Sequence, residues 1–286
     1  MRLMRVGRAG AEIPAVYAGK DQYIDVSDLV EDFDAAFFEA GGSALLADPV
    51  AERLAAGASR PLAGQRVGAP VARPHQILCI GLNYTDHAQA TGQSLPEEPV
   101  LATKAPNTLT GPEDPLVLPR GSTRTDWEVE LGVVVGRRVS YLPDERAAEE
   151  AIAGYVLVND VTERFLQFER GGQWSKGKSA ATFNPCGPYL VTRDELPDVS
   201  DVGLWLEVNG QRRQHGSTRN MVFSPAHLVY YLSQFMVLEP GDLINTGTPA
   251  GTGMSSDPPS YLAPGDVVEL GGDPLGTQRH TVVASP

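Results

Sequence analysis

The sequence DWEVELGVVVG at residues 126–136 is the segment around which the rest of the chain can be interpreted. Its β-branched and aromatic residues are typical of a β-strand. Because successive side chains of a strand point to opposite faces, Glu128 and Glu130 are expected on one face, and the apolar residues beside them on the other. Two neighbouring carboxylates in such a setting repel each other and lose hydration unless a positive charge lies between them.

A second apolar run, GYVLVND at residues 154–160, ends in another acid, Asp160. If this strand lies beside the first, Glu128, Glu130 and Asp160 form a site with three carboxylates that leaves coordination positions for water and substrate. Oxygen ligands favour a hard cation, so we expect Mg²⁺ first and then Mn²⁺ or Ca²⁺. For an isolated Glu-x-Glu pair the simpler interpretation would be two solvated glutamates on an exposed strand face.

Composition narrows the class of protein. The chain has 286 residues, 42% of them hydrophobic, which suits one large soluble domain or two modest ones. Its formal net charge of −13 argues against nucleic acid or an anionic membrane as the main partner. An anionic small substrate remains compatible with this charge, because a metal and a few local cations can reverse the field inside a cleft.

The chain has two cysteines, Cys79 and Cys186, and neither belongs to a partner motif, so a disulfide framework and a zinc site are not expected. The N-terminus lacks the apolar core of a signal peptide, and no apolar run approaches the length of a membrane span. These features predict a cytoplasmic protein.

The order of segments predicts a small N-terminal domain at residues 1–72 and a catalytic domain at residues 73–286, divided by a Gly/Pro-rich segment. We expect a helix over residues 142–155 and another that begins at Ser224. Asn209-Gly210 between two strand-like runs predicts a hairpin.

Other candidate site residues lie at strand ends. His87 follows a buried strand, where a general base could lie, although a histidine satisfied by its helix neighbours is the commoner case. A stretch dense in cations, which includes Arg164 and Lys178, follows Asp160 and suggests an anion-binding cleft; the alternative is a solvated loop with internal ion pairs. The glycine-rich turn around Thr248 would expose backbone N–H groups suited to a carboxylate.

An ordered set of motifs resembles the fumarylacetoacetate hydrolase superfamily, and most of all its bacterial 2,4-diketo-3-deoxy-sugar-acid hydrolase and acylpyruvate hydrolase branch. The motifs include GLNYTDHA, TDWEVELGVVVG, GYVLVNDVTER, QFERGGQWSKGKS and NTGTPAGTG, and the set runs over residues 75–283. The resemblance implies a strand-rich α+β fold with a mixed β-roll, a small N-terminal domain and a homodimer.

The resemblance also implies roles for individual residues. Metal ligands fall on Glu128, Glu130 and Asp160, in agreement with the argument from the carboxylates. The resemblance makes His87 the base. It also implies that four residues lie in the pocket against the substrate: Arg164, Gln167, Lys178 and Thr248.

The chain departs from the branch at two positions. The glutamate that usually follows the histidine by three residues is Ala90 here, so the His–Glu pair is incomplete unless Glu97 or Glu98 replaces it. The second departure is Leu82, where many relatives have arginine.

The leading hypothesis is a metal-dependent hydrolase that cleaves a C–C bond of a 2,4-diketo acid, with His87 as base, Lys178 as a catalytic cation and a metal-stabilised pyruvate enolate. A decarboxylase or keto–enol isomerase of a related 2-oxo acid is the alternative, because neither reaction needs an activated water and position 90 is alanine. A non-catalytic ligand-binding protein on the same fold is the third possibility.

Overall fold

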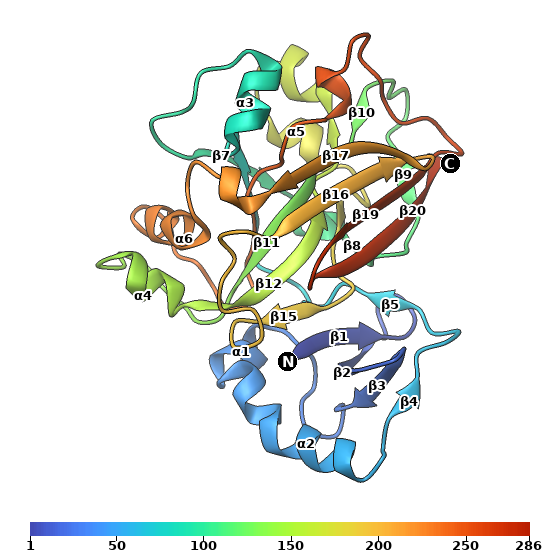
Figure 1. The fold of residues 1–286 in the computed structure, drawn as a ribbon, viewed down its shortest axis with the longest axis vertical. Helices are drawn as coiled ribbons and strands as arrows, with labels where there is room; N and C mark the ends of the chain where they lie inside the picture. Colours follow the sequence, from blue (N-terminus) through green and yellow to red (C-terminus); the bar gives the residue numbers. More distant parts are fainter.

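The computed structural model describes all 286 residues and has a strand-rich α+β fold, as expected (Figure 1). The strand predicted from DWEVELGVVVG is β11 (Val129–Val135), and it lies inside a large mixed sheet. In spatial order this sheet consists of β4 (Arg60–Pro61), β3 (Gln22–Asp25), β2 (Ile13–Gly19), β1 (Arg2–Val6), β15 (Leu190–Thr192), β12 (Ile152–Asn159), β11, β18 (Leu243–Asn245), β6 (Ile77–Gly81) and β7 (Val100–Lys104), and β5 (Val67–Gly68) pairs with β1.

The neighbours of β11 determine which chain segments meet at the carboxylates. β12 runs antiparallel to β11, and Glu130 lies opposite Val158. β18 pairs with the other edge of β11, and it runs parallel to β6. The ends of β12, β18 and β6, which are far apart in sequence, therefore lie near Glu128 and Glu130.

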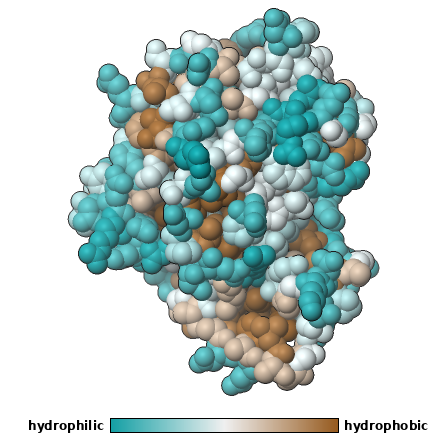
Figure 2. Space-filling model, viewed as in Figure 1, coloured by the Kyte–Doolittle hydropathy of each residue, from teal (hydrophilic) through white to brown (hydrophobic).

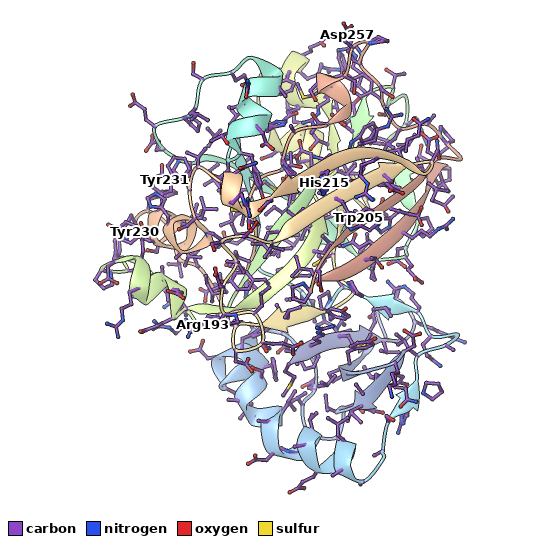
Figure 3. All side chains as sticks on the ribbon, viewed as in Figure 1. Arg193, Trp205, His215, Tyr230, Tyr231 and Asp257 are labelled. Atoms are coloured by element: carbon purple, nitrogen blue, oxygen red, sulfur yellow. The ribbon has the colours of Figure 1, made fainter.

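A second sheet packs with the large one in the upper lobe of Figure 1. It consists of β17 (Gln211–Ser217), β16 (Gly203–Val208), β19 (Val267–Gly272), β20 (Gly276–Ala284) and β9 (Leu116–Leu118). The hairpin prediction is confirmed: Asn209 and Gly210 connect β16 to β17 with φ of 52° and 73°, the left-handed region that this turn requires. Trp205 and His215 face each other across this pair of strands (Figure 3).

Hydrophobic packing buries both faces of β11. Val129, Leu131 and Val133 belong to the largest core cluster, of 34 residues, whereas Val134 belongs to a second cluster of 20 residues. This alternation is the one expected of a strand covered on both sides. An acidic side chain on such a strand is therefore withdrawn from water.

Residues 1–72 form the lower lobe in Figure 1. Besides β1 to β5 this lobe contains α1 (Ala35–Glu39), the 3₁₀ turn η1 (Gly42–Leu46) and α2 (Ala47–Ala55). Strand β1 pairs with β15, so the strands of the lobe continue the large sheet. The division into a small domain at residues 1–72 and a catalytic domain at residues 73–286 stays a prediction.

The helices of the upper lobe are short. They are α3 (Thr85–Thr91), α4 (Glu145–Glu149), the π-helical turn η3 (Phe165–Glu169), α5 (Ser175–Lys178) and α6 (Pro225–Ser233). The prediction of α6 is confirmed, because Ser224 Oγ accepts a hydrogen bond from the backbone N–H of His227 at 3.1 Å. The helix expected over residues 142–155 was too long. It ends after Glu149, because Ile152 already pairs with Val135 as the first residue of β12.

Several two- and three-residue elements complete the fold. Strand β10 (Thr125–Asp126) pairs with β13 (Thr162–Glu163), and β8 (Leu109–Thr110) pairs with β14 (Asn184–Pro185). The remaining 3₁₀ turns are η2 (Pro106–Thr108), η4 (Thr218–Asn220) and η5 (Gly253–Ser255). The pairing of β10 with β13 brings the segment before Glu128 beside the segment that follows Asp160, which narrows the site described below.

The surface drawn in Figure 2 is largely hydrophilic, with separate hydrophobic patches over both lobes. The longest helices, α2 and α6, have nine residues each, so none of the helices has the length and hydrophobicity needed to cross a bilayer.

Candidate metal centre

The three predicted carboxylates lie together in the interior. One oxygen of each of Glu128, Glu130 and Asp160 lies within 4.8 Å of the others, and all three side chains are buried. Strand pairing causes this proximity: Asp160 follows β12, and its backbone N–H donates to the carbonyl of Glu128 at 2.9 Å. The interpretation of an exposed, solvated Glu-x-Glu pair is therefore wrong.

Two buried lysines neutralise part of this charge. Lys178 Nζ lies 2.5 Å from Asp160 Oδ2 and 3.2 Å from Glu128 Oε2. Lys104 Nζ lies 2.5 Å from the other oxygen of Asp160, Oδ1. Burial alone would raise the pKa of Asp160, but the charges of Lys104 and Lys178 lower that pKa to about 2. Asp160 is therefore ionised, and both of its oxygens have cationic partners.

Arg164 holds the opposite side of Glu128. Its Nη2 lies 2.7 Å from Glu128 Oε1 and 2.8 Å from Asp126 Oδ2. Burial opposes ionisation of Glu128, and the charges of Lys178 and Arg164 outweigh it, so the pKa of Glu128 is lowered. Asp126 also accepts hydrogen bonds from the backbone N–H groups of Gly253 and Met254, at 2.6 and 3.0 Å. Asp126 thus fixes both Arg164 and the loop that closes this side of the site.

Glu130 is different, because no cationic side chain pairs with it. Its Oε2 accepts one hydrogen bond, at 2.8 Å, from the backbone N–H of Gly247. Burial and the nearby charges of Asp160 and Glu128 raise the pKa of Glu130 well above its usual range. A carboxylate buried without a cation carries a large desolvation cost. The cluster therefore lacks positive charge at the point where the carboxylate oxygens of all three acids converge.

This donor set fits a hard divalent cation. Carboxylate oxygens are the ligands that Mg²⁺, Mn²⁺ and Ca²⁺ prefer. A cation held between Glu128, Glu130 and Asp160 would balance the charge of Glu130, which the lysines and Arg164 leave uncompensated.

The other predicted site residues line the same small cavity. His87, on α3, lies there with the two glutamates, and Arg164 Nη1 donates to Gln167 Oε1 at 3.0 Å. The cavity volume is about 30 Å³, room for a water molecule, so an organic acid can enter only when side chains of the lining move apart. From the predicted set, its lining contains His87, Glu128, Glu130, Arg164, Gln167, Lys178 and Thr248. A larger cavity of about 740 Å³ lies where the two lobes meet and contains none of these residues.

His87 has no orienting carboxylate. Its Nδ1 is buried and makes no hydrogen bond, and burial lowers the pKa of His87 despite the nearby charge of Glu128. Ala90, where the family's glutamate would be, is exposed on α3. Glu98 accepts a hydrogen bond from the Tyr231 hydroxyl at 2.9 Å, and Glu97 is exposed. Neither glutamate replaces the missing partner in this structure.

Thr248 lines the cavity. Its hydroxyl donates to the carbonyl of Val129 at 2.9 Å and accepts from Gln214 Nε2 at 2.8 Å, so the hydroxyl proton is already used. The backbone N–H of Thr248 makes no hydrogen bond within the protein. Gly247 before it has φ of 99°, and a Cβ there would lie 2.8 Å from the Cβ of Asn83. The turn therefore offers a free backbone donor, and only glycine fits its tight approach to the chain.

Three functional neighbours were missed from the sequence. Lys104 and Gln214 come from β7 and β17, far along the chain from the carboxylates, and Asp126 lies two residues before Glu128. One feature of the sequence could have indicated that Lys104 is buried: this lysine ends the apolar run VLATK. Its amine also donates to the carbonyl of Val161 at 3.1 Å, and all of its partners are buried.

Comparison with known proteins identifies the family. The family model described as fumarylacetoacetate hydrolase, C-terminal, matches residues 76–283. A curated Burkholderia ambifaria protein with a provisional hydrolase name is 48% identical over 281 residues, 97% of each chain. The structure is also similar to that of 2-hydroxyhepta-2,4-diene-1,7-dioate isomerase from Mycobacterium marinum, with 30% identity, a TM-score of 0.78 and coverage of 100% of this chain and 99% of that one.

A further match is the crystal structure of maleylpyruvate hydrolase from Sphingobium sp. SYK-6 in complex with manganese(II) and pyruvate. It is 26% identical, with a TM-score of 0.82 and coverage of 100% of both chains. The match to the family model, the coverage of nearly the whole chain by its relatives and the buried acidic cluster all agree. This chain belongs to the fumarylacetoacetate hydrolase superfamily.

Proposed function

We propose that this protein is a divalent-metal-dependent hydrolase that cleaves a C–C bond in a 2,4-diketo acid. The observation that carries the proposal is the buried Glu130, a carboxylate without a cation, in a cluster that also contains Glu128 and Asp160. The manganese and pyruvate bound to the Sphingobium enzyme support this assignment of metal and product class. When bound, the divalent cation would polarise the 2-keto group and stabilise negative charge that develops on its oxygen.

The chain's own residues supply the remaining chemistry. The free backbone N–H of Thr248 would bind the substrate carboxylate, and Gln167, held by Arg164, would donate a hydrogen bond beside it. Lys178 keeps its proton, because the charges of Asp160 and Glu128 raise its pKa against the effect of burial. Lys178 therefore acts as a fixed positive charge and not as a base.

His87 is the base. Its buried imidazole is neutral, because burial lowers its pKa, so it can accept a proton from water. The water oxygen adds to the distal carbonyl carbon, and the C–C bond then breaks with its electron pair on the pyruvate fragment. That enolate takes up a proton, and the products are pyruvate and the carboxylic acid of the acyl group.

The direct test is turnover of acetylpyruvate by pure protein with Mg²⁺ or Mn²⁺, followed as loss of diketone absorbance and release of pyruvate. We expect turnover with metal, none after chelation, and none for Glu130→Gln. If metal-loaded protein cleaves no acylpyruvate and Glu128→Ala behaves like the native chain, the proposal is wrong. No detectable metal binding by calorimetry would favour a ligand-binding role.

A second candidate, decarboxylation or keto–enol isomerisation of a related 2-oxo acid, is favoured by one observation: His87 Nδ1 lacks a carboxylate partner and Ala90 is exposed. Pyruvate release from oxaloacetate, without cleavage of acylpyruvates, would support it. Ala90→Glu separates the two, because a glutamate three residues after His87 on α3 lies on the same helix face. Hydrolysis gained by this variant would mean that the native site lacks the means to activate water.

A further inference from the structure

Part of the cavity lining is an apolar wall. It consists of Ile80, Leu82, Phe168, Trp174 and Met254. The rings of Phe168 and Trp174 meet edge to face, with centroids 5.8 Å apart and an interplanar angle of 83°. The Trp174 ring lies directly on Gly81, where a Cβ would collide with it. The absence of a side chain at Gly81 thus allows the indole to line the cavity.

No cation is available on this wall. The only lysine or arginine side chains that line the cavity are Arg164 and Lys178, and each is buried and bound to two carboxylates. The cationic side chains of the neighbouring loop contact other residues of that loop. The Arg170 guanidinium lies 5.7 Å from the centroid of the Phe165 ring, and Lys176 Nζ donates to the carbonyl of Arg170 at 2.6 Å.

Leu82 has an unusual backbone. Its φ of 54° is in the left-handed region, which branched residues rarely adopt, and its side chain is half-buried at the cavity. Leu82 thus combines a strained backbone with an apolar side chain at the cavity. A substrate carboxylate placed against Leu82 and Trp174 would lose water without gaining a cationic partner.

From this wall we infer the substrate class: the acyl group of the diketo acid is uncharged and apolar, and it lies against Leu82, Phe168 and Trp174. The inference rests on the proposed function and adds to it the specificity for the acyl group. It separates this chain from a relative whose name specifies a dioate, a compound with two carboxylates.

The test uses two substrates of the same length. Pentanoylpyruvate ends in a methyl group, and glutarylpyruvate has a carboxylate in its place. We expect kcat/KM for pentanoylpyruvate to exceed that for glutarylpyruvate by about 100-fold. Leu82→Arg, which adds a cation to the wall, should lower this ratio at least about 10-fold by improving turnover of glutarylpyruvate.

The matched control is Leu95→Arg, which adds the same charge at an exposed leucine outside the cavity lining and should leave the ratio unchanged. Trp174→Ala should lower kcat/KM for pentanoylpyruvate much more than for acetylpyruvate, because the acetyl group has only one methyl to pack against the apolar wall. Equal use of the two long substrates, or a preference for glutarylpyruvate, would overturn the inference.

Failure of the proposed function can be told apart from failure of this inference, because in that case no diketo acid is cleaved. In that case calorimetry of the two long acids with Mn²⁺-loaded protein decides the inference, and equal or tighter binding of glutarylpyruvate contradicts it.

Discussion

Two clusters of charged residues in this molecule differ in whether every carboxylate has a cationic partner. This difference distinguishes a cluster that holds the fold together from one that can bind a metal. The N-terminal cluster joins Arg5, Glu12, Asp32 and Arg66 to Asp114 of the upper lobe. Every carboxylate in it has an arginine within 3.4 Å. Burial raises the pKa of Glu12, but the hydrogen bond from Arg66, a backbone hydrogen bond and the charges of Arg5 and Arg66 together outweigh it, so the pKa is lowered.

In the metal cluster one carboxylate has no cationic partner. Asp160 has two lysine partners, whereas Glu130, equally buried, has none, and its pKa is raised. A cluster in which every carboxylate has a cationic partner fixes one segment against another, as Arg66 does with Asp114. A cluster with one unmatched carboxylate is less stable alone and gains most from a bound cation.

The largest effect is expected from Asp160→Asn. It leaves Lys104 and Lys178 buried without their shared carboxylate, and should lower the free energy of unfolding by about 3 kcal/mol. Urea denaturation of the metal-free protein measures this change. Asp257→Asn, at an exposed loop residue at the edge of the molecule in Figure 3, is the control and should be neutral. Equal stability of the two variants would show that Asp160 does not hold the lysines.

Glu130→Gln should have the opposite signature. It removes the carboxylate that has no cation, so metal affinity should fall at least about 100-fold. The melting temperature of the metal-free protein should stay the same or rise, because glutamine can still accept the hydrogen bond of Gly247. Calorimetric titration with Mn²⁺ and a thermal melt provide the two readouts. A strong loss of stability with unchanged affinity would contradict the contrast between Glu130 and Asp160.

Gln214→Leu tests whether the Thr248 turn is held in place from β17. The variant loses the hydrogen bonds to Thr248 Oγ1 and to the carbonyl of Pro249, both 2.8 Å. If Gln214 positions the turn that binds the substrate carboxylate, KM should rise about 10-fold with a smaller change in kcat. Gln211→Leu, exposed on the same strand, should change neither constant. A loss confined to kcat would exclude this positioning role.

The smallest effect is expected from the N-terminal cluster. Glu12→Gln leaves the Arg66–Asp114 and Arg5–Asp32 pairs intact, so it should cost about 1 kcal/mol of stability at neutral pH and no activity. The folded-state pKa of Glu12 is lowered, so its contribution is complete above the unfolded pKa of about 4.3 and is lost as pH falls through the folded pKa. The difference in stability between native protein and variant should therefore shrink in acid. Glu113→Gln, an exposed neighbour of Asp114, is the control.

The sequence was most informative where the chemistry follows local periodicity. Alternation along one strand placed Glu128 and Glu130 on one face, and a second apolar run ending in an acid indicated Asp160. The hairpin at Asn209-Gly210 and the start of α6 after Ser224 follow from turn and capping chemistry that acts within a few residues. The helix over residues 142–155 was predicted too long, because pairing of Ile152 with Val135 overrides local helix propensity.

By itself, the sequence determined that this chain has a strand carrying two acids, a third acid at the end of the next strand and a set of motifs specific to one superfamily, because these are properties of neighbouring residues. Only the tertiary structure decided which charges meet. It gave Asp160 two lysines and Glu130 none, and it placed the Trp174 indole on Gly81. Lys104 and Gln214 reach the site through strand pairing over long sequence separations, and burial then sets the energy of each contact.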